Sequence, residues 1–231
     1  GWFDWYLATN IKNKENLDEH LLKGLSTKGV PVSLSGSIIP FKYNNIESFL
    51  SIIKKKIGIV VMESIRGQYP SVDFIKAINK EVKKRKIILI CDEITTGFRA
   101  NTSGCFLKVG LKPDIVVYGK GMGNGFAISA VVGKKKIMNM AQESFISSSN
   151  WSERVGYIAA LATIKTIKKQ RTWIHLSKIG RYVKENWLKI FKKYQLNIEV
   201  SDFEPLLTMK PNYGKINDYL DIEESNQNAN N

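Results

Sequence analysis

The chain has 231 residues, of which 43% are hydrophobic, and this length allows one substantial buried core and the beginning of a second domain. Its longest uncharged runs, such as residues 121–133, fall well short of the roughly 20 apolar residues that cross a bilayer, so we expect a soluble protein without a membrane span. The net charge of +14 would suit a nucleic-acid partner, but the basic runs are short, widely separated and free of interleaved aromatic residues, so we expect no nucleic-acid binding.

Residues 1–41 are rich in Gly, Ser, Asn and Pro and show no sustained hydrophobic period, which predicts long loops with short elements. The first residues lack the basic start, apolar middle and cleavage site of a signal peptide, and they contain no initiator Met. We therefore expect the sequence to begin inside a longer protein.

A regular pattern of strands and helices begins after this region. Residues 57–62 form a continuous apolar run typical of a buried strand, residues 72–85 have apolar side chains at helical spacing, and residues 87–91 form a second apolar run. Strand, helix and strand in this order predict a right-handed crossover between two parallel strands. Cys91 lies in the second run, and the two cysteines are too few for a disulfide framework, so we expect a reducing, cytoplasmic location.

Two more strands are predicted at residues 115–118 and 129–132, on either side of the glycine-dense segment 119–125. Amphipathic or small-residue helical patterns follow at residues 153–169 and 173–194. The whole pattern predicts an α/β fold, with three layers in the order α/β/α and a mostly parallel sheet.

The domain organisation follows from where this pattern weakens. We expect residues 1–195 to form a large domain and residues 196–222 to begin a small α+β domain, since prolines break the pattern there. The tail 223–231 is polar and Asn-rich, which predicts disorder.

An acid and an amine follow two of the predicted strands. Asp92 ends the run 87–91, and Lys120 comes shortly after the run 115–118. In open α/β sheets ligands gather at the carboxyl ends of parallel strands, so these two side chains could face one small aromatic ring. Pyridoxal phosphate (PLP) needs such a pair, a lysine for its aldehyde and an acid that keeps its pyridine nitrogen protonated. Taken alone, Lys120 also fits a surface lysine, and Asp92 also fits a strand-end turn or a helix cap.

Longer segments around both residues resemble the class III aminotransferases. They are residues 91–99, which read Cys-Asp-Glu-Ile-Thr-Thr-Gly-Phe-Arg, and residues 113–133 around Lys120. The Thr-Gly-Phe-Arg after the acid matches the glutamate-1-semialdehyde aminomutase-like branch, and the similarity continues in order from residues 2–6 to residues 145–154. The resemblance implies the large domain of a fold type I PLP-dependent transferase, with PLP as the cofactor and no metal site.

The resemblance also implies roles for individual residues. Lys120 would form the Schiff base with PLP and move protons, and Asp92 would pair with the pyridine nitrogen. Ile94 would pack on one face of the ring, and Gln68 would approach the phenolic oxygen of the cofactor. Ser149 stands where the family has a Thr that reaches the cofactor phosphate of the partner subunit, which implies a homodimer with a shared active site. Ile94 as plain core, Gln68 as a loop residue and Ser149 as a polar group near a helix start are the ordinary alternatives.

The ends of the chain depart from the family pattern. The phosphate-binding loop and the aromatic residue that stacks on the ring lie upstream of the segment that matches Gly1, and most of the small domain lies downstream of Asn231, so we expect a partial chain. The implied activity is amino-group transfer between small amines or amino acids and carbonyl substrates. An aminomutase and a transaminase both fit, and a catalytically inactive, truncated protein with the PLP fold is the alternative.

Overall fold

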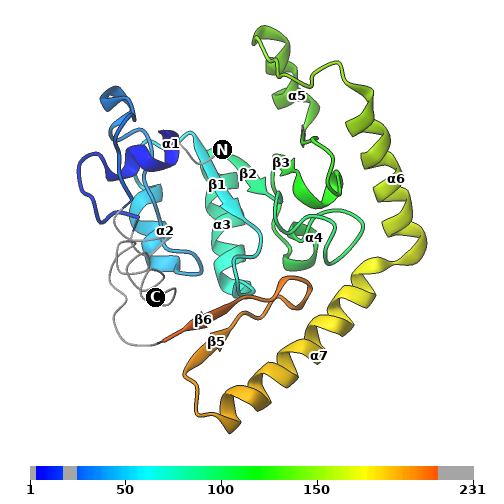
Figure 1. Ribbon diagram of the computed structural model, residues 1–231. Coiled ribbons are helices and arrows are strands. Elements are labelled where there is room, and N and C mark those ends of the chain that lie inside the picture. The colour runs from blue at the N-terminus through cyan, green and yellow to red at the C-terminus, as the bar shows by residue number, and fades with distance from the viewer. Residues whose placement is uncertain (1–3, 18–24, 213–231) are drawn as a thin grey trace. The chain divides into compact units, whose positions relative to one another are not determined.

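The computed structural model describes residues 4–17 and 25–212, and the chain divides into two compact units (Figure 1). One unit comprises Gly1–Lys54 together with Asn212–Asn231. The other comprises Lys55–Pro211 and contains all the strands named below.

The described part of the smaller unit has short elements, as the composition of residues 1–41 predicts. They are α1 (Asp4–Leu7), η1 (Ala8–Asn10), η2 (Val32–Leu34) and α2 (Ile46–Ile53). Helix α2 begins after Asn45, whose Oδ1 accepts a hydrogen bond from the Ser48 backbone N–H at 2.8 Å. It buries Phe49 and Ile53. A capped start and an apolar face therefore explain why this short segment is helical.

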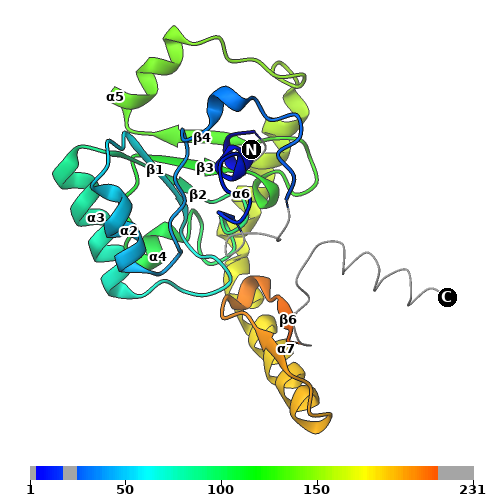
Figure 2. The ribbon, with the colours of Figure 1, turned by 90° about the vertical axis from the view of Figure 1, so that its left-hand side faces the viewer.

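The larger unit is built on a four-stranded sheet with the order β1-β2-β3-β4. Its strands are β1 (Ile59–Glu63), β2 (Ile88–Asp92), β3 (Ile115–Tyr118) and β4 (Ala130–Gly133). The first three are parallel and β4 is antiparallel to β3, so the predicted α/β fold with a mostly parallel sheet is confirmed (Figure 2). Strands β1 and β2 end later than their apolar runs predict, because ladder pairing continues through the acids Glu63 and Asp92.

Helix α3 (Val72–Arg85) has the bounds that its apolar spacing predicts. It begins after Ser71, whose hydroxyl accepts a hydrogen bond from the Phe74 backbone N–H at 3.2 Å, and it ends where Lys86 adopts a left-handed φ of 55°. Figures 1 and 2 both show the helix alongside β1 and β2. The residues that it buries form one stripe, and they are Phe74, Ile75, Ile78 and Val82.

The two faces of the sheet differ in burial. Side chains on one face are buried, and they are Val60, Met62, Leu89, Cys91, Val116 and Tyr118. On the other face Ile59 and Val61 are 53% and 57% exposed. Because side chains alternate along a strand, Glu63 and Asp92 belong to this more open face. The two acids therefore lie at the carboxyl end of the sheet, on the side that a ligand can approach.

Two long helices follow the sheet. They are α6 (Arg154–Gln170) and α7 (Thr172–Lys193), and the chain turns between them at Arg171, which has a left-handed φ of 51°. Short elements connect the strands to these helices, namely α4 (Phe106–Val109), η3 (Lys120–Met122), α5 (Lys135–Met138) and η4 (Asn139–Glu143). No helix within the described ranges is long and apolar enough to span a membrane.

A two-stranded hairpin follows α7. It comprises β5 (Ile198–Val200) and the antiparallel β6 (Met209–Pro211), with η5 (Glu204–Leu206) between them. Helix α7 contacts η5 at Gly180, where a Cβ atom would overlap the backbone carbonyl of Glu204. The predicted start of a small domain at residue 196 stays a prediction, and the tail 223–231 lies outside the described residues.

Candidate functional site

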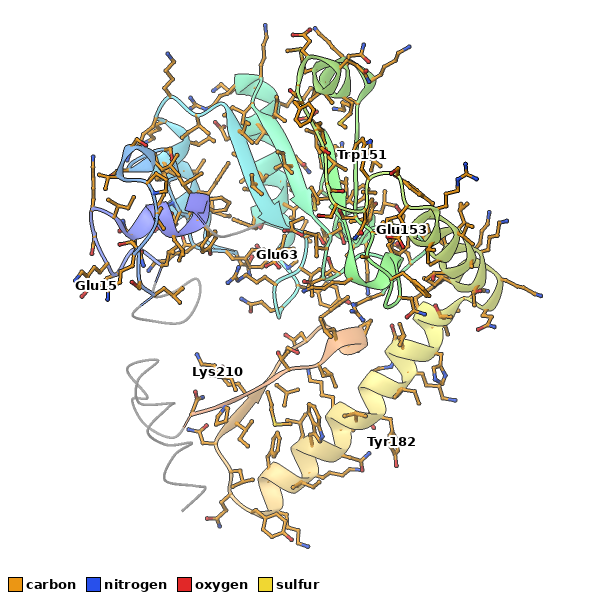
Figure 3. All side chains as sticks on the ribbon, turned by 45° about the horizontal axis from the view of Figure 1, so that its top comes forward. Glu15, Glu63, Trp151, Glu153, Tyr182 and Lys210 are labelled. Carbon is orange, nitrogen blue, oxygen red and sulfur yellow. The ribbon has the colours of Figure 1, made fainter. Side chains whose placement is uncertain are left out.

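The carboxyl ends of three parallel strands meet at one edge of the sheet. Glu63 is the register partner of Asp92, and Asp92 is the register partner of Val117. After β3 the chain passes through Gly119 into η3, which begins at Lys120 with a left-handed φ of 39°. Figure 3 shows Glu63 at the end of β1, where the strand passes into the following loop. This edge therefore carries two acids and an amine, as expected for a ligand site in an open α/β sheet.

The side chain of Asp92 closes the turn that follows β2. Its Oδ1 accepts a hydrogen bond from the backbone N–H of Ile94 at 2.9 Å. Asp92 therefore stabilises a turn at the end of the strand, which is one of the roles that the sequence allowed for it. Asp92 is half-buried. Within the described ranges its other carboxylate oxygen makes no hydrogen bond, which leaves that oxygen available to a ligand.

The next acid, Glu93, holds the loop that follows Asp92. It is fully buried at 0% exposure. Its Oε1 accepts a hydrogen bond from the Phe106 backbone N–H at 2.7 Å, and its Oε2 accepts one from the Thr96 hydroxyl at 2.6 Å. The backbone N–H of Gly97 donates to the Glu93 carbonyl at 2.8 Å. Because a buried carboxylate is costly unless its oxygens are satisfied, these bonds tie the whole loop to one conformation.

Two glycines allow this loop and the segment before Lys120 to approach closely. A Cβ at Gly97 would lie 2.9 Å from Cδ1 of Tyr118, the last residue of β3. A Cβ at Gly119 would lie 3.4 Å from Cγ2 of Ile94. Ile94 is therefore in contact distance of the backbone that carries Lys120.

The amine of Lys120 is accessible and has a side-chain partner. Its Nζ donates a hydrogen bond to Oγ1 of Thr95 at 2.9 Å, and the residue is exposed. In the part of the chain that the structure describes, Lys120 and Asp92 form no direct ion pair. The amine therefore points toward the loop that follows Asp92, and its partner there is the Thr95 hydroxyl.

The electrostatics of Glu63 connect the three charged residues. Burial raises the pKa of Glu63, Arg66 lowers it through an ion pair with 3.3 Å between Nη1 and Oε2, Asp92 raises it and Lys120 lowers it. The pKa of Glu63 is therefore set first by burial and then by the charges of Arg66, Asp92 and Lys120.

Two of the predicted site residues are not hydrogen-bonded to this cluster in the described part of the chain. Gln68 is exposed in the loop after β1, and Ser149 is exposed in the segment between η4 and α6. Neither makes a hydrogen bond to Lys120 or Asp92 among the described residues. The structure thus brings Lys120, Asp92 and Ile94 together, and the roles of Gln68 and Ser149 stay predictions.

Sequence reasoning did not single out three residues of this edge: Glu63, Glu93 and Thr95. Glu63 carries the same signal as Asp92, an acid directly after an apolar run, and could have been found. Glu93 contacts Phe106, 13 positions away, and Thr95 contacts Lys120, 25 positions away, so no local sequence pattern predicts these contacts.

Other candidate sites in the larger unit have different chemistry. A cavity of about 450 Å³ lies beside α7, with Tyr69, Arg181, Lys184 and Glu204 among its lining residues, and it includes none of the residues of the strand-end cluster. Within the described residues, no group of three or more His, Cys, Asp or Glu side chains is placed to bind a metal ion.

Comparison with known proteins identifies relatives along most of the sequence. The family model for the class-III aminotransferases matches residues 21–201. The glutamate-1-semialdehyde 2,1-aminomutase of Nitrosopumilus maritimus (strain SCM1) is 32% identical over 210 residues, which are 81% of this chain and 49% of the relative. The 3-aminobutyryl-CoA aminotransferase of Cloacimonas acidaminovorans (strain Evry) is 28% identical over 91% of this chain and 50% of its own. The chain spans about half the length of these curated relatives.

A solved structure shares the fold. The PLP internal aldimine form of the FumI protein from Sphingopyxis sp. MTA144 matches with a TM-score of 0.75 and 21% sequence identity. The match covers 81% of this chain and 48% of that chain. It supports the α/β arrangement described above.

Proposed function

Since the chain belongs to the class-III aminotransferase family, we propose that Lys120 and Asp92 take part in the PLP-dependent transfer of an amino group. The observation that carries this proposal is the placement of an accessible amine and a half-buried acid at the carboxyl ends of neighbouring strands. Both residues lie inside the matched range 21–201.

The donor groups at this edge fit PLP. The cofactor has an aldehyde, which needs an accessible primary amine, and a pyridine nitrogen, which needs a carboxylate. Lys120 is exposed, and Asp92 has one carboxylate oxygen without a hydrogen bond in the described part of the chain. Because Gly119 has no side chain, Ile94 packs directly on the backbone that carries Lys120.

When bound, PLP captures amines at its aldehyde carbon and its protonated ring takes up electrons from the reacting bond. The nitrogen of Lys120 would bind that carbon and, once a substrate amine has replaced it, would carry a proton between substrate and cofactor. Asp92 would hold the proton on the ring nitrogen through a charge-assisted hydrogen bond, which is worth roughly 1.5–3 kcal/mol.

Ile94 and Gln68 have supporting positions in the proposal. Ile94 lies against Gly119, beside Lys120, so its side chain can cover one face of a ring held there. Gln68 lies in the loop that follows β1, five residues after Glu63, and it is exposed. We assign Gln68 to the phenolic oxygen of the cofactor.

We further propose a homodimer in which Ser149 reaches the cofactor phosphate of the partner subunit. Ser149 lies in a segment with exposed apolar side chains, among them Phe145 at 98% and Trp151 at 56% exposure. Helix α6 adds two more exposed apolar side chains, Ile158 and Leu161, at 65% and 58% exposure. Exposed apolar side chains in such numbers are typical of a protein interface. Sedimentation of the Leu161→Asp variant as a monomer, against a dimeric wild type, would support the assignment, and a monomeric wild type would contradict it.

The substrates are proposed as a class. The two curated relatives carry the names of an aminomutase and an aminotransferase, and both reactions move an amino group to a carbonyl carbon. We therefore propose a small amine or amino acid and a carbonyl compound as substrates. Product analysis distinguishes an aminomutase, which needs no second substrate, from a transaminase, which does.

We propose a cytoplasmic location because both cysteines are free thiols. Cys91 and Cys105 are free and buried. Burial raises the pKa of the Cys105 thiol to about 12, so this thiol stays protonated and unreactive. Free thiols without a disulfide partner suit a reducing compartment.

Covalent trapping tests the proposed function. PLP is added to the purified chain, the imine is reduced with borohydride, and the modified lysine is located by peptide mass spectrometry. We expect the pyridoxyl group on Lys120, together with a visible absorbance band that Lys120→Ala abolishes. Lys136→Ala is the matched control, since Lys136 is an exposed lysine outside the site, and it should leave the band unchanged. Equal labelling of Lys120 and Lys136 would contradict the proposal and would favour a catalytically inactive protein.

A further inference from the structure

We infer that Thr95 is a positioning residue for the reactive amine of Lys120. The inference extends the proposed function, because it assumes that Lys120 is the residue that attacks an aldehyde. It rests on the hydrogen bond that Nζ of Lys120 donates to Oγ1 of Thr95 at 2.9 Å.

The hydroxyl of Thr95 is held in place by its neighbours. On one side Asp92 closes the turn by accepting from the Ile94 backbone N–H at 2.9 Å. On the other side Thr96 donates to the buried carboxylate of Glu93 at 2.6 Å. The carbonyl of Thr95 itself accepts a hydrogen bond from Nε of Arg99 at 2.6 Å. The backbone at this position therefore has little freedom to move.

The side chain adds a second constraint. Thr is branched at Cβ, so its χ1 angle has few accessible values. Lys120, by contrast, has a long, flexible stem on an exposed residue. A fixed acceptor reduces the directions in which the amine can point, and it brings the amine toward the strand ends where Asp92 and Glu63 lie.

The bond also has a chemical consequence for the attacking nitrogen. In the reaction with an aldehyde, the ammonium group of Lys120 first gives one proton to solvent water. The nitrogen lone pair then forms a bond to the aldehyde carbon, and the two remaining amine protons leave with the aldehyde oxygen as water. Because the hydroxyl accepts an N–H hydrogen, it orients the nitrogen without occupying the lone pair. We expect positioning of this kind to raise the rate of bond formation by about three- to tenfold, the effect of one ordinary hydrogen bond.

Labelling kinetics with pyridoxal, which has no phosphate, test the inference. The full chain is incubated with pyridoxal and cyanoborohydride, which fixes the new bond as a secondary amine, and the modified Lys120 peptide is measured over time. Thr95→Val keeps the shape of the side chain and removes the hydroxyl, so it should slow modification of Lys120 about three- to tenfold. Thr95→Ser keeps the hydroxyl and should stay near the wild-type rate.

The controls separate positioning from folding and from the proposed function. Thr102→Val makes the same substitution at an exposed threonine of the same loop and should change nothing. Thr95→Ala serves as the second hydroxyl-free variant if Thr95→Val does not fold. Wild-type speed in the hydroxyl-free variant, or a slow Thr95→Ser, would overturn the inference. The proposed function is judged by a different comparison, the rate at Lys120 against that at Lys136 in the wild type.

Discussion

Glu63 and Asp92 are register partners at the carboxyl ends of β1 and β2, so two carboxylates lie side by side on the open face of the sheet. Of these two acids, only Glu63 has an ion-pair partner in the described part of the chain, Arg66 at 3.3 Å. Burial and the charge of Asp92 nevertheless raise the pKa of Glu63 above its ordinary value of 4.5. The pKa of Glu63 is therefore sensitive to the neighbouring charges.

The raised pKa of Glu63 predicts a pH dependence of stability. Between 4.5 and the raised value, the folded chain binds more protons at this group than the unfolded chain, so the free energy of unfolding falls as pH rises through that interval. Glu63→Gln removes this dependence and should stabilise the chain near neutral pH relative to the wild type. The measurement is urea unfolding of both proteins from acidic to neutral pH.

Glu81 is the control for this prediction, because its pKa is shifted in the opposite direction. A hydrogen bond from Arg85 lowers the pKa of Glu81, so its contribution is present above 4.5 and is lost as pH falls through the lowered value. Glu81→Gln should therefore destabilise the chain at neutral pH. A Glu63→Gln variant that behaves like Glu81→Gln would show that the Arg66 ion pair outweighs burial.

The charge of Lys120 should be measurable at Glu63. Lys120 lowers the pKa of Glu63 and Asp92 raises it. We expect Lys120→Met to raise the pKa of Glu63 further and Asp92→Asn to lower it, as followed by the carbon chemical shift of the Glu63 carboxyl group during an NMR titration. Lys136→Met is the control that should leave the titration unchanged. Shifts of the same sign in both site variants would refute a common site.

Removal of the Glu93 carboxylate should loosen the loop that carries Thr95. In Glu93→Ala the Phe106 backbone N–H and the Thr96 hydroxyl lose their acceptor in a buried place, which should cost about 2–5 kcal/mol of unfolding free energy. Denaturant unfolding measures the cost. Asp73→Asn, at an exposed ion pair on α3, should change stability by less than about 0.5 kcal/mol. A similar small change for Glu93→Ala would mean that the loop does not depend on this carboxylate.

The contact between α7 and η5 predicts the effect of a single methyl group. In Gly180→Ala the new Cβ would overlap the Glu204 carbonyl, so helix and hairpin must separate, at a cost of about 1–3 kcal/mol. Gly58→Ala is the matched control, because a Cβ there meets no atom within 4 Å. Equal thermal midpoints of the two variants would indicate that η5 moves away from α7 freely.

Local signals in the sequence predicted the strands of the large sheet, the long helices and the candidate pair Asp92 and Lys120. The bounds of α3 were predicted without error because its apolar residues recur at helical spacing within one short segment. Asp92 and Lys120 could be paired in advance because the carboxyl ends of parallel strands meet at one edge. The ordered motifs around them predicted the class-III aminotransferase family, which the family model confirms.

Only the tertiary structure decided how Lys120 is held. Its partner Thr95 is 25 positions away, and the two meet because β2 and β3 are neighbours and because Glu93 fixes the loop between them. The sequence also could not predict that β4 is antiparallel to β3, because the hydrophobic pattern of a short apolar strand does not depend on the direction of the strand. A sequence records which side chains are present, whereas the distance between an amine and a hydroxyl depends on how distant segments pack.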